Sequence, residues 1–88
     1  MTAPGLFAIA ARPNPFTSGL TVDVPAGTAI ELHDVAGRRV RDWSADGSVT
    51  RIVWDGRDAL GRRAPPGLYW VTARTAHAVR RVRVIKLE

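Results

Sequence analysis

The sequence predicts an all-β fold, an antiparallel β-sandwich of about seven short strands. Along most of the 88 residues, short apolar runs alternate with polar residues, which is the period of a half-buried strand. Segments rich in Gly, Pro, Asn and Asp separate these runs at the spacing of turns between strands. No segment shows a convincing helical repeat of apolar positions.

The first two predicted strands lie near the start of the chain. Residues 6–11 form the first strand, which ends at residues 12–15 because two prolines there remove backbone donors. In residues 20–24, three apolar side chains alternate with Thr and Asp until Pro25 and Gly27 break the run. One face of this second strand should therefore be buried and the other wet.

A hairpin follows. Ile30 and Leu32 alternate with polar residues in its first strand, and a tight turn over residues 34–37 places Gly37 in the left-handed conformation. The chain then returns as a strand over residues 38–43. We predict that residues 44–47 form a polar connection to the next strand.

Two aromatic residues, Trp54 and Tyr69, flank the longest connection. Trp54 ends a short strand that includes Ile52, and Tyr69 begins a strand that runs to Arg74. Between them, Asp-Gly pairs, Gly61 in the left-handed region and a Pro-Pro-Gly run turn or stiffen the backbone. Aromatic residues at strand ends commonly fill the ends of the core in small sandwiches, so we expect Trp54 and Tyr69 to be buried. We interpret the connection between them as a corner of the sandwich and not as an active site.

In the last predicted strand, residues 78–87, the apolar positions switch from one face of the strand to the other. Val82 and Val84 share one face, whereas Ile85 and Leu87 share the opposite one. Such a change indicates either a bulge that returns Ile85 and Leu87 to the core, or a face that a partner covers. The sequence leaves both interpretations open.

The chain is long enough for one small core, and we expect a single domain over residues 6–88 after a disordered or extended segment, residues 1–5. It contains no cysteine, no internal repeat that we recognise, no apolar run of membrane-spanning length and no signal peptide. Thirteen Lys and Arg residues against eight Asp and Glu residues give a net charge of +5. This excess favours acidic partners without identifying one.

Five segments together resemble a known kind of domain. They are Asn14-Pro15-Phe16, residues 32–40, residues 54–61, residues 66–69 and the basic, aliphatic residues 79–87. Their order and spacing are similar to those of the immunoglobulin-like domain of flagellar hook-capping proteins. They are equally similar to C-terminal modules of large exported bacterial proteins, including type IX secretion sorting domains.

The resemblance implies an immunoglobulin-like sandwich without catalytic residues or cofactor, in a protein that is exported to the periplasm, the cell surface or the medium. Two roles follow from it. The module is either a structural and protein-interaction part of a larger assembly, or a terminal sorting signal that export machinery recognises. A cargo domain encoded before Met1 would favour the second role.

Possible chemical sites have simpler explanations. Four aspartates, Asp23, Asp34, Asp55 and Asp58, are potential calcium ligands, but they lack the dense alternation of a calcium loop and suit turn capping better. His33 and His77 lie far apart in the sequence, and no third ligand has a suitable spacing. We therefore predict no metal site, no enzymatic activity and no small-molecule substrate.

The arginines of the last two strands suggest a partner surface. Trp70 and Arg74 fall on the polar face of one strand, and Arg81 and Arg83 on the polar face of the next. With Ile85 and Leu87 they form the predicted partner-binding set. The simpler alternative is a solvated strand face whose charges discourage edge pairing. Among partners, we favour a protein over a nucleic acid, because Arg and Trp are enriched in protein interfaces and no nucleic-acid motif occurs.

Overall fold

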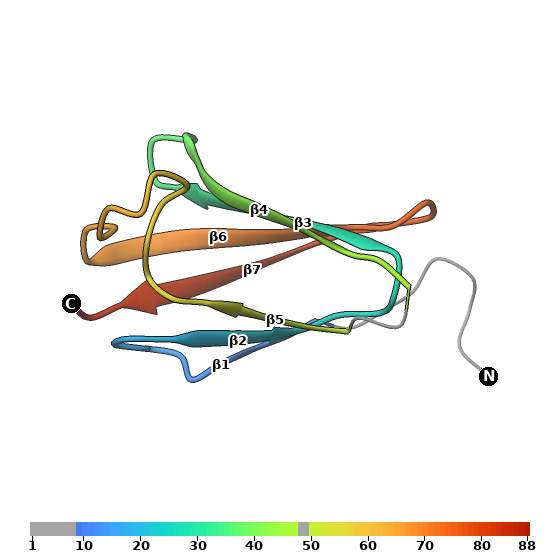
Figure 1. Cartoon of the computed structure of the whole chain (residues 1–88), viewed down its shortest axis with the longest axis horizontal. Helices are drawn as coiled ribbons and strands as arrows, with labels where there is room; N and C mark the ends of the chain where they lie inside the picture. The colour runs from blue at the N-terminus through green and yellow to red at the C-terminus, as the bar shows by residue number, and fades with distance from the viewer. Residues whose placement is uncertain (1–8, 48–49) are drawn as a thin grey trace.

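The computed structural model describes residues 9–47 and 50–88, which form seven strands (Figure 1). These are β1 (Ala10–Arg12), β2 (Leu20–Asp23), β3 (Thr28–Asp34), β4 (Arg39–Ala45), β5 (Arg51–Trp54), β6 (Gly67–Arg74) and β7 (Val79–Lys86). In this part of the chain, no helix has the length and apolarity needed to cross a membrane. The predicted number of strands is confirmed.

The strands form two antiparallel sheets that face each other (Figure 1). One sheet has the order β1-β2-β5 and the other the order β4-β3-β6-β7. β3 and β4 are joined as a hairpin within one sheet, whereas the connections β2–β3, β4–β5 and β5–β6 pass from one sheet to the other. The predicted all-β sandwich is therefore confirmed.

Three aromatic rings fill one end of the core. Trp54 is fully buried, and its ring meets Phe16 and Tyr69 edge-on, with ring centroids 5.4 Å and 5.2 Å apart. This edge-to-face geometry is the one that aromatic quadrupoles favour. Aliphatic residues from both sheets complete the core: Leu20, Val22, Val24, Ile30, Leu32, Ala45, Ile52, Ala64, Val71, Ala73 and Val84. The predicted burial of Trp54 and Tyr69 is confirmed.

Two side-chain hydrogen bonds fasten the connection between β5 and β6. The indole Nε1 of Trp54 donates to the carbonyl oxygen of Arg57 at 2.8 Å, and the hydroxyl of Tyr69 donates to the carbonyl oxygen of Pro65. Immunoglobulin-like sandwiches carry a comparable tyrosine at this corner. The polar atom of each aromatic side chain is therefore hydrogen-bonded to the backbone of the loop against which the ring packs.

Two predicted boundaries differ from the structure. β1 begins at Ala10, and residues 1–8, which include the expected N-terminal segment and part of the expected first strand, lie outside the described residues. β4 continues through Ser44 to Ala45, so the prediction of a connection starting at residue 44 was wrong. Ala45 is completely buried opposite Thr28, because pairing with β3 and burial outweigh its weak strand preference.

β7 contains no bulge, so one of the two interpretations of its apolar residues is wrong. It pairs with β6 in one unbroken register from Val79 to Lys86. Lys86 takes the inward position after Val84 and is only 3% exposed, whereas Ile85 and Leu87 point outward. The apolar residues change sides because a lysine stem, not a leucine, occupies the end of the core.

The outer edge of β7 is partly covered by the segment between β1 and β2. The side-chain amide of Asn14 donates to the carbonyl oxygen of Arg83 and accepts from the backbone N–H of Ile85, both at 3.0 Å. Phe16 then exchanges backbone hydrogen bonds with Ile85 and Leu87, each 2.8 Å long. This part of the edge is therefore closed to a further strand.

Candidate interaction surfaces

The predicted partner residues lie together on the outer side of two neighbouring strands. In the β6–β7 register, Trp70 lies opposite Arg83, and Thr72 lies opposite Arg81. Ile85 follows on the same side of β7. We call this surface the β6–β7 face, formed by Trp70, Thr72, Arg74, Arg81, Arg83 and Ile85, together with the exposed Leu87 directly after β7.

Contacts within the β6–β7 face hold its polar side chains in place. The guanidinium carbon of Arg83 lies 6.0 Å from the centre of the Trp70 ring, and Nε of Arg81 donates to Oγ1 of Thr72 at 3.4 Å. Ile85 and Leu87 are 44% and 57% exposed. The face thus combines a half-buried indole, guanidinium groups and exposed aliphatic side chains.

A hollow of about 460 Å³ lies beside the β6–β7 face. Trp70, Thr72, Arg74 and Arg81 form one side of it. β3 and the following turn supply the other side through Glu31, His33, Asp34, Val35 and Gly37. Nε2 of His33 lies 3.4 Å from a carboxylate oxygen of Glu31, a polar pair that the sequence analysis did not anticipate.

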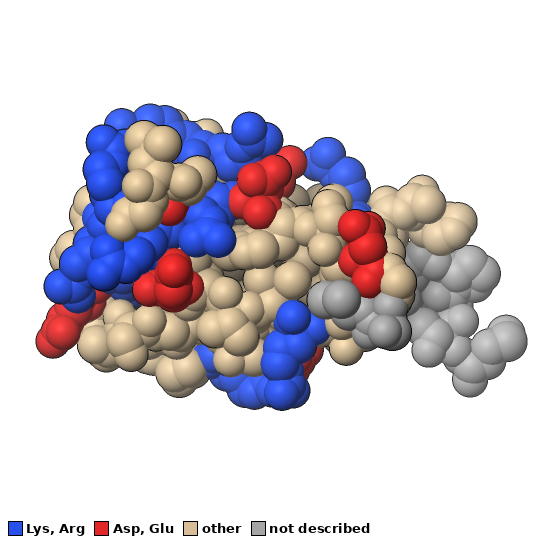
Figure 2. All heavy atoms as spheres, in the orientation of Figure 1, with Lys and Arg blue, Asp and Glu red and all other residues tan. Residues whose placement is uncertain are grey.

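The second concentration of charge lies at one end of the sandwich. Lys and Arg side chains gather over the end that contains the β3–β4 turn and the β5–β6 connection, at the left in Figures 1 and 2. A hollow of about 460 Å³ lies between these two loops. We call this surface the basic end; its charged lining residues are Arg38, Arg39, Arg62, Arg63, Asp34 and Asp58.

The two loops of the basic end share a hexapeptide pattern that the sequence analysis missed. Residues 34–39 read Asp-Val-Ala-Gly-Arg-Arg, and residues 58–63 read Asp-Ala-Leu-Gly-Arg-Arg. Four of the six positions are identical, so the expectation of no internal repeat was wrong at this short length. The two copies start 24 positions apart and lie in different turns. Six residues are far fewer than the repeating unit of a repeat architecture, so the pattern is easily overlooked.

The aspartate that begins each copy makes the same hydrogen bonds. Oδ1 of Asp34 accepts from the backbone N–H groups of Ala36 and Arg38, and Oδ2 accepts from Nε of Arg38, at 2.9–3.0 Å. Asp58 repeats this pattern with Leu60 and Arg62 at 2.9–3.1 Å. Both aspartates therefore cap turns, as predicted.

Those bonds also change the acidity of the two aspartates. The backbone hydrogen bond from Arg38 is the largest cause that lowers the pKa of Asp34, and the one from Arg62 has this effect on Asp58. Each carboxylate is thus kept ionised inside its own loop.

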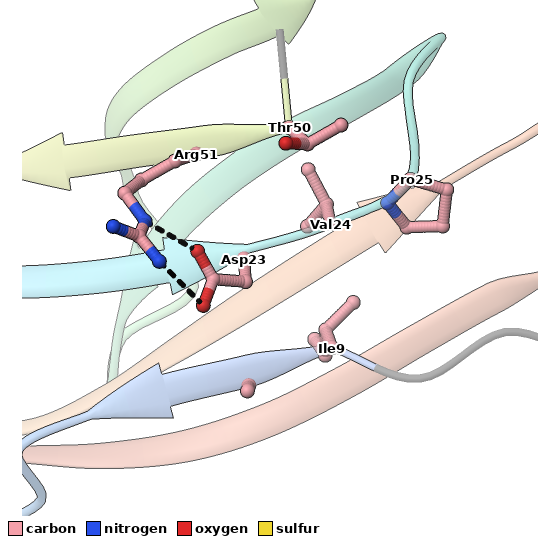
Figure 3. A pocket seen from close by; sticks show the side chains of 7 residues that line it. Ile9, Asp23, Val24, Pro25, Thr50 and Arg51 are labelled. Atoms are coloured by element: carbon pink, nitrogen blue, oxygen red, sulfur yellow. Dashed lines mark hydrogen bonds and ion pairs between the residues drawn. The ribbon is translucent and has the colours of Figure 1, made fainter.

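The other predicted carboxylates also have arginine partners. Asp23 on β2 accepts a hydrogen bond from Arg51 at 2.8 Å (Figure 3). It also lies 2.5 Å from Arg12, and the hydrogen bond from Arg51 is the largest cause that lowers the pKa of Asp23. A hollow of about 530 Å³ adjoins this pair, lined also by Ile9, Ala10, Val24, Pro25 and Thr50. Oδ1 of Asp55 lies 3.3 Å from Arg41 and accepts from the backbone N–H of Arg57.

The histidines lie on different elements. His33 belongs to β3, whereas His77 is in the turn between β6 and β7. Within residues 9–47 and 50–88, no group of three or more His, Cys, Asp or Glu side chains is arranged to hold a metal ion. The prediction that these residues form no metal site stays a prediction.

Lys86, the single lysine, is a buried charged residue that no sequence pattern singles out. Its Cε lies 3.2 Å from the position that a Cβ would occupy at Gly56, so the stem packs against the β5–β6 connection. Burial is the largest cause that lowers the pKa of Lys86, and the nearby charge of Arg63 acts in the same direction.

No protein-family model matches the sequence, and no curated protein matches it. A solved structure that does match is PorZ, an essential bacterial surface component of the type IX secretion system of Porphyromonas gingivalis. The match has a TM-score of 0.78 and 23% sequence identity, and it covers 91% of this chain but 11% of PorZ. At this identity the match shows the sandwich fold alone.

Proposed function

We propose that this domain is a non-catalytic structural and protein-interaction module of an exported bacterial protein or larger assembly, and that it docks through the β6–β7 face. The observation that carries this proposal is the outward position of Ile85 and Leu87 at the end of an unbroken β7. Exposed aliphatic residues beside Trp70 and Arg83 have the composition of a protein interface.

The cover of the β7 edge by Asn14 and Phe16 supports docking through side chains and not through strand addition. Asn14 and Phe16 already occupy the backbone groups of residues 83–87, so a partner strand does not extend the sheet there. The partner instead rests on the side chains of the face. Guanidinium groups of Arg81 and Arg83 then favour a partner with acidic residues at the rim of the contact.

Chemistry at the remaining polar residues is not part of the proposal. Asp23, Asp34, Asp55 and Asp58 each lie against arginine side chains, and Glu31 lies 3.4 Å from His33. These contacts support a binding role and give no residue that we assign to catalysis.

A second candidate function is a sorting module that type IX-like export machinery recognises. It is favoured by the same fold in a segment of PorZ, which is itself a surface component of that system. The two candidates predict different partners: a permanent neighbour in the mature assembly, or a component of the export machinery that is bound during passage.

Photo-crosslinking in the native host tests the proposal. A photoreactive residue at the position of Ile85 should yield a covalent adduct with a protein, whereas one at Val53, 61% exposed on β5, should not. The partner's identity, and whether the adduct forms before or after export, separates the two candidates. The double substitution Arg81→Glu with Arg83→Glu should reduce the yield of the adduct formed at position 85.

The control for that double variant is Arg12→Glu with Arg51→Glu, which makes the same change of net charge on the sheet β1-β2-β5 and should leave the yield of adduct at position 85 unchanged. Equal adducts at positions 53 and 85, or an adduct at 85 that the Arg81 and Arg83 changes leave intact, would contradict docking through the β6–β7 face.

A further inference from the structure

The two hexapeptide loops present the same side chains from the same scaffold. In addition to the carboxylate bonds, the N–H of Gly37 donates to the carbonyl oxygen of Asp34, and the N–H of Asp34 donates to that of Arg38, both at 3.0 Å. The second loop has the corresponding bonds, 3.0 Å for Gly61 to Asp58 and 2.8 Å for Asp58 to Arg62. Both loops are therefore held in shape before any partner arrives.

The locked aspartates divide the four arginines into two kinds. Arg38 and Arg62 are ion-paired to the aspartate of their own loop, at 3.0 Å and 3.1 Å. Arg39 and Arg63, the last residues of the two copies, are exposed and form no ion pair with any carboxylate of the described residues. Two guanidinium groups thus remain available beside one hollow.

Apolar side chains accompany these two arginines. Val35 lines the hollow and is 72% exposed; Leu60 lies near the tip of the second loop and is 76% exposed. Pro65, Pro66 and Leu68 form the floor of the hollow on the β5–β6 side. Large apolar residues at turn tips have no role in the turns themselves, because the aspartates and glycines define the backbone.

We propose that the basic end is a second docking site, which binds an acidic protein segment carrying an aliphatic side chain. A guanidinium fork matches a carboxylate in two parallel hydrogen bonds, so Arg39 and Arg63 suit Asp or Glu residues of the segment. The apolar hollow between them suits the aliphatic side chain. A nucleic acid would match the charge but would leave Val35, Leu60 and the prolines without apolar contact.

This site uses other arginines than the β6–β7 face. The hollows beside the two surfaces share Asp34 and Val35, but Arg39 and Arg63 line only the hollow of the basic end. The inference therefore stands or falls independently of the proposed function.

The test uses nuclear magnetic resonance with the short capped peptide acetyl-Glu-Leu-Glu-amide. We expect its addition to shift backbone amide signals of residues 35–39 and 60–68 and to leave those of β7 unchanged. Arg39→Glu with Arg63→Glu should weaken this binding by about tenfold or more. Arg12→Glu with Arg51→Glu, which makes the same change of net charge on the sheet β1-β2-β5, should not change it. Replacing the central Leu of the peptide by Ser should also reduce the shifts.

Each of the following results would overturn the proposal. One is a set of shifts spread over all arginine-bearing surfaces, or no shifts at all; another is equal binding by the Leu and Ser peptides. The third is tighter binding of a single-stranded oligonucleotide of equal charge at the same residues. If the double charge reversal unfolds the domain, Arg39→Gln with Arg63→Gln removes the two charges without adding repulsion and permits the same comparison.

Discussion

The hydroxyl of Tyr69 reaches back to the carbonyl oxygen of Pro65, while its ring packs edge-on against Trp54. Tyr69 lies near the start of β6 and Trp54 ends β5, so their contact holds together the two ends of the connection at the basic end. Changes to either residue should therefore affect the loop as well as the core.

Trp54→Ala should lower the free energy of unfolding by about 3 to 5 kcal/mol, because it leaves a cavity in the core and removes both ring contacts. Chemical denaturation measures this loss. Trp43→Ala is the matched control, since Trp43 is only partly buried on β4, and it should cost clearly less. Equal losses for the two variants would show that Trp54 does not organise the core.

Tyr69 should make the domain sensitive to alkali. Burial is the largest cause that raises its pKa above the ordinary value of 10.0, and the charge of Asp34 adds to it. The neutral phenol is thus favoured by folding, so its stabilising contribution is complete below pH 10 and is lost as pH rises through the folded-state pKa. Because Tyr69 is the only tyrosine, phenolate absorbance reports on it alone.

In that titration, the midpoint for the folded protein should lie above the midpoint for the unfolded chain in denaturant. Tyr69→Phe serves as the control, since its free energy of unfolding should fall less between neutral and alkaline pH than that of the unchanged protein. A folded-state midpoint at or below that of the denatured chain would disprove burial of the phenol.

Gly37 and Gly61 should tolerate substitution poorly for conformational reasons alone. Their φ angles are +83° and +82°, and a Cβ at either position would meet no atom within 4 Å. Gly37→Ala and Gly61→Ala should each cost about 1 to 2 kcal/mol of unfolding free energy. Gly19→Ala is the control: its φ lies outside the left-handed region and its nearest neighbour is at 3.8 Å, so it should be neutral or slightly stabilising.

Asp34 and Asp58 should contribute stability that is lost in acid. Their pKa values in the folded state lie below 3.8, mainly because of the backbone hydrogen bonds from Arg38 and Arg62. Their contribution is therefore present above that pH and disappears as pH falls through the lowered folded-state values. Thermal unfolding at about pH 7 and about pH 2 measures it.

Asp34→Asn with Asp58→Asn should destabilise the domain at neutral pH, and the difference from the unchanged protein should shrink in acid. Asp42→Asn is the control, because Asp42 is exposed on β4 and forms no ion pair among the described residues. A double variant that unfolds like the unchanged protein at neutral pH would mean that the carboxylate bonds add nothing to stability.

Thermal unfolding should give the same midpoint in chelator and in excess calcium. Asp23 and Asp55 already accept hydrogen bonds from arginine side chains, and the other two aspartates cap their own loops. Calcium would have to displace these partners to gather enough oxygen ligands. A midpoint that rises with calcium and no longer does so in Asp55→Asn would reveal a site at the β5–β6 connection.

The alternation of apolar residues was sufficient to predict the sandwich, and the residue types of the long connection were sufficient to predict burial of Trp54 and Tyr69. These features depend on local patterns. The register irregularity between Leu32 and His33 was not predicted, because the hairpin turn was located but its pairing was not. Lys86 was not predicted to be buried, since a lysine stem has no periodic signature.

Of the two candidate surfaces, one was predicted from the sequence and the other was not. Strand parity placed Trp70, Arg81 and Arg83 on one face, and the register of β6 with β7 confirms this arrangement. The basic end was missed because its hollow depends on two loops that lie 24 residues apart in the sequence and meet only in the folded chain. The repeated hexapeptide was the available signal.

The cover of β7 by Asn14 and Phe16 has a consequence for the order of events during synthesis. Their hydrogen bonds join positions separated by about 70 residues, so the ribosome must release nearly the whole sequence before they can form. Until then Phe16 and Trp54 lack part of their surroundings, and the emerging polypeptide offers unpaired strands to chaperones and to neighbouring chains. The sandwich is therefore completed only once β7 and the segment around Asn14 and Phe16 have met.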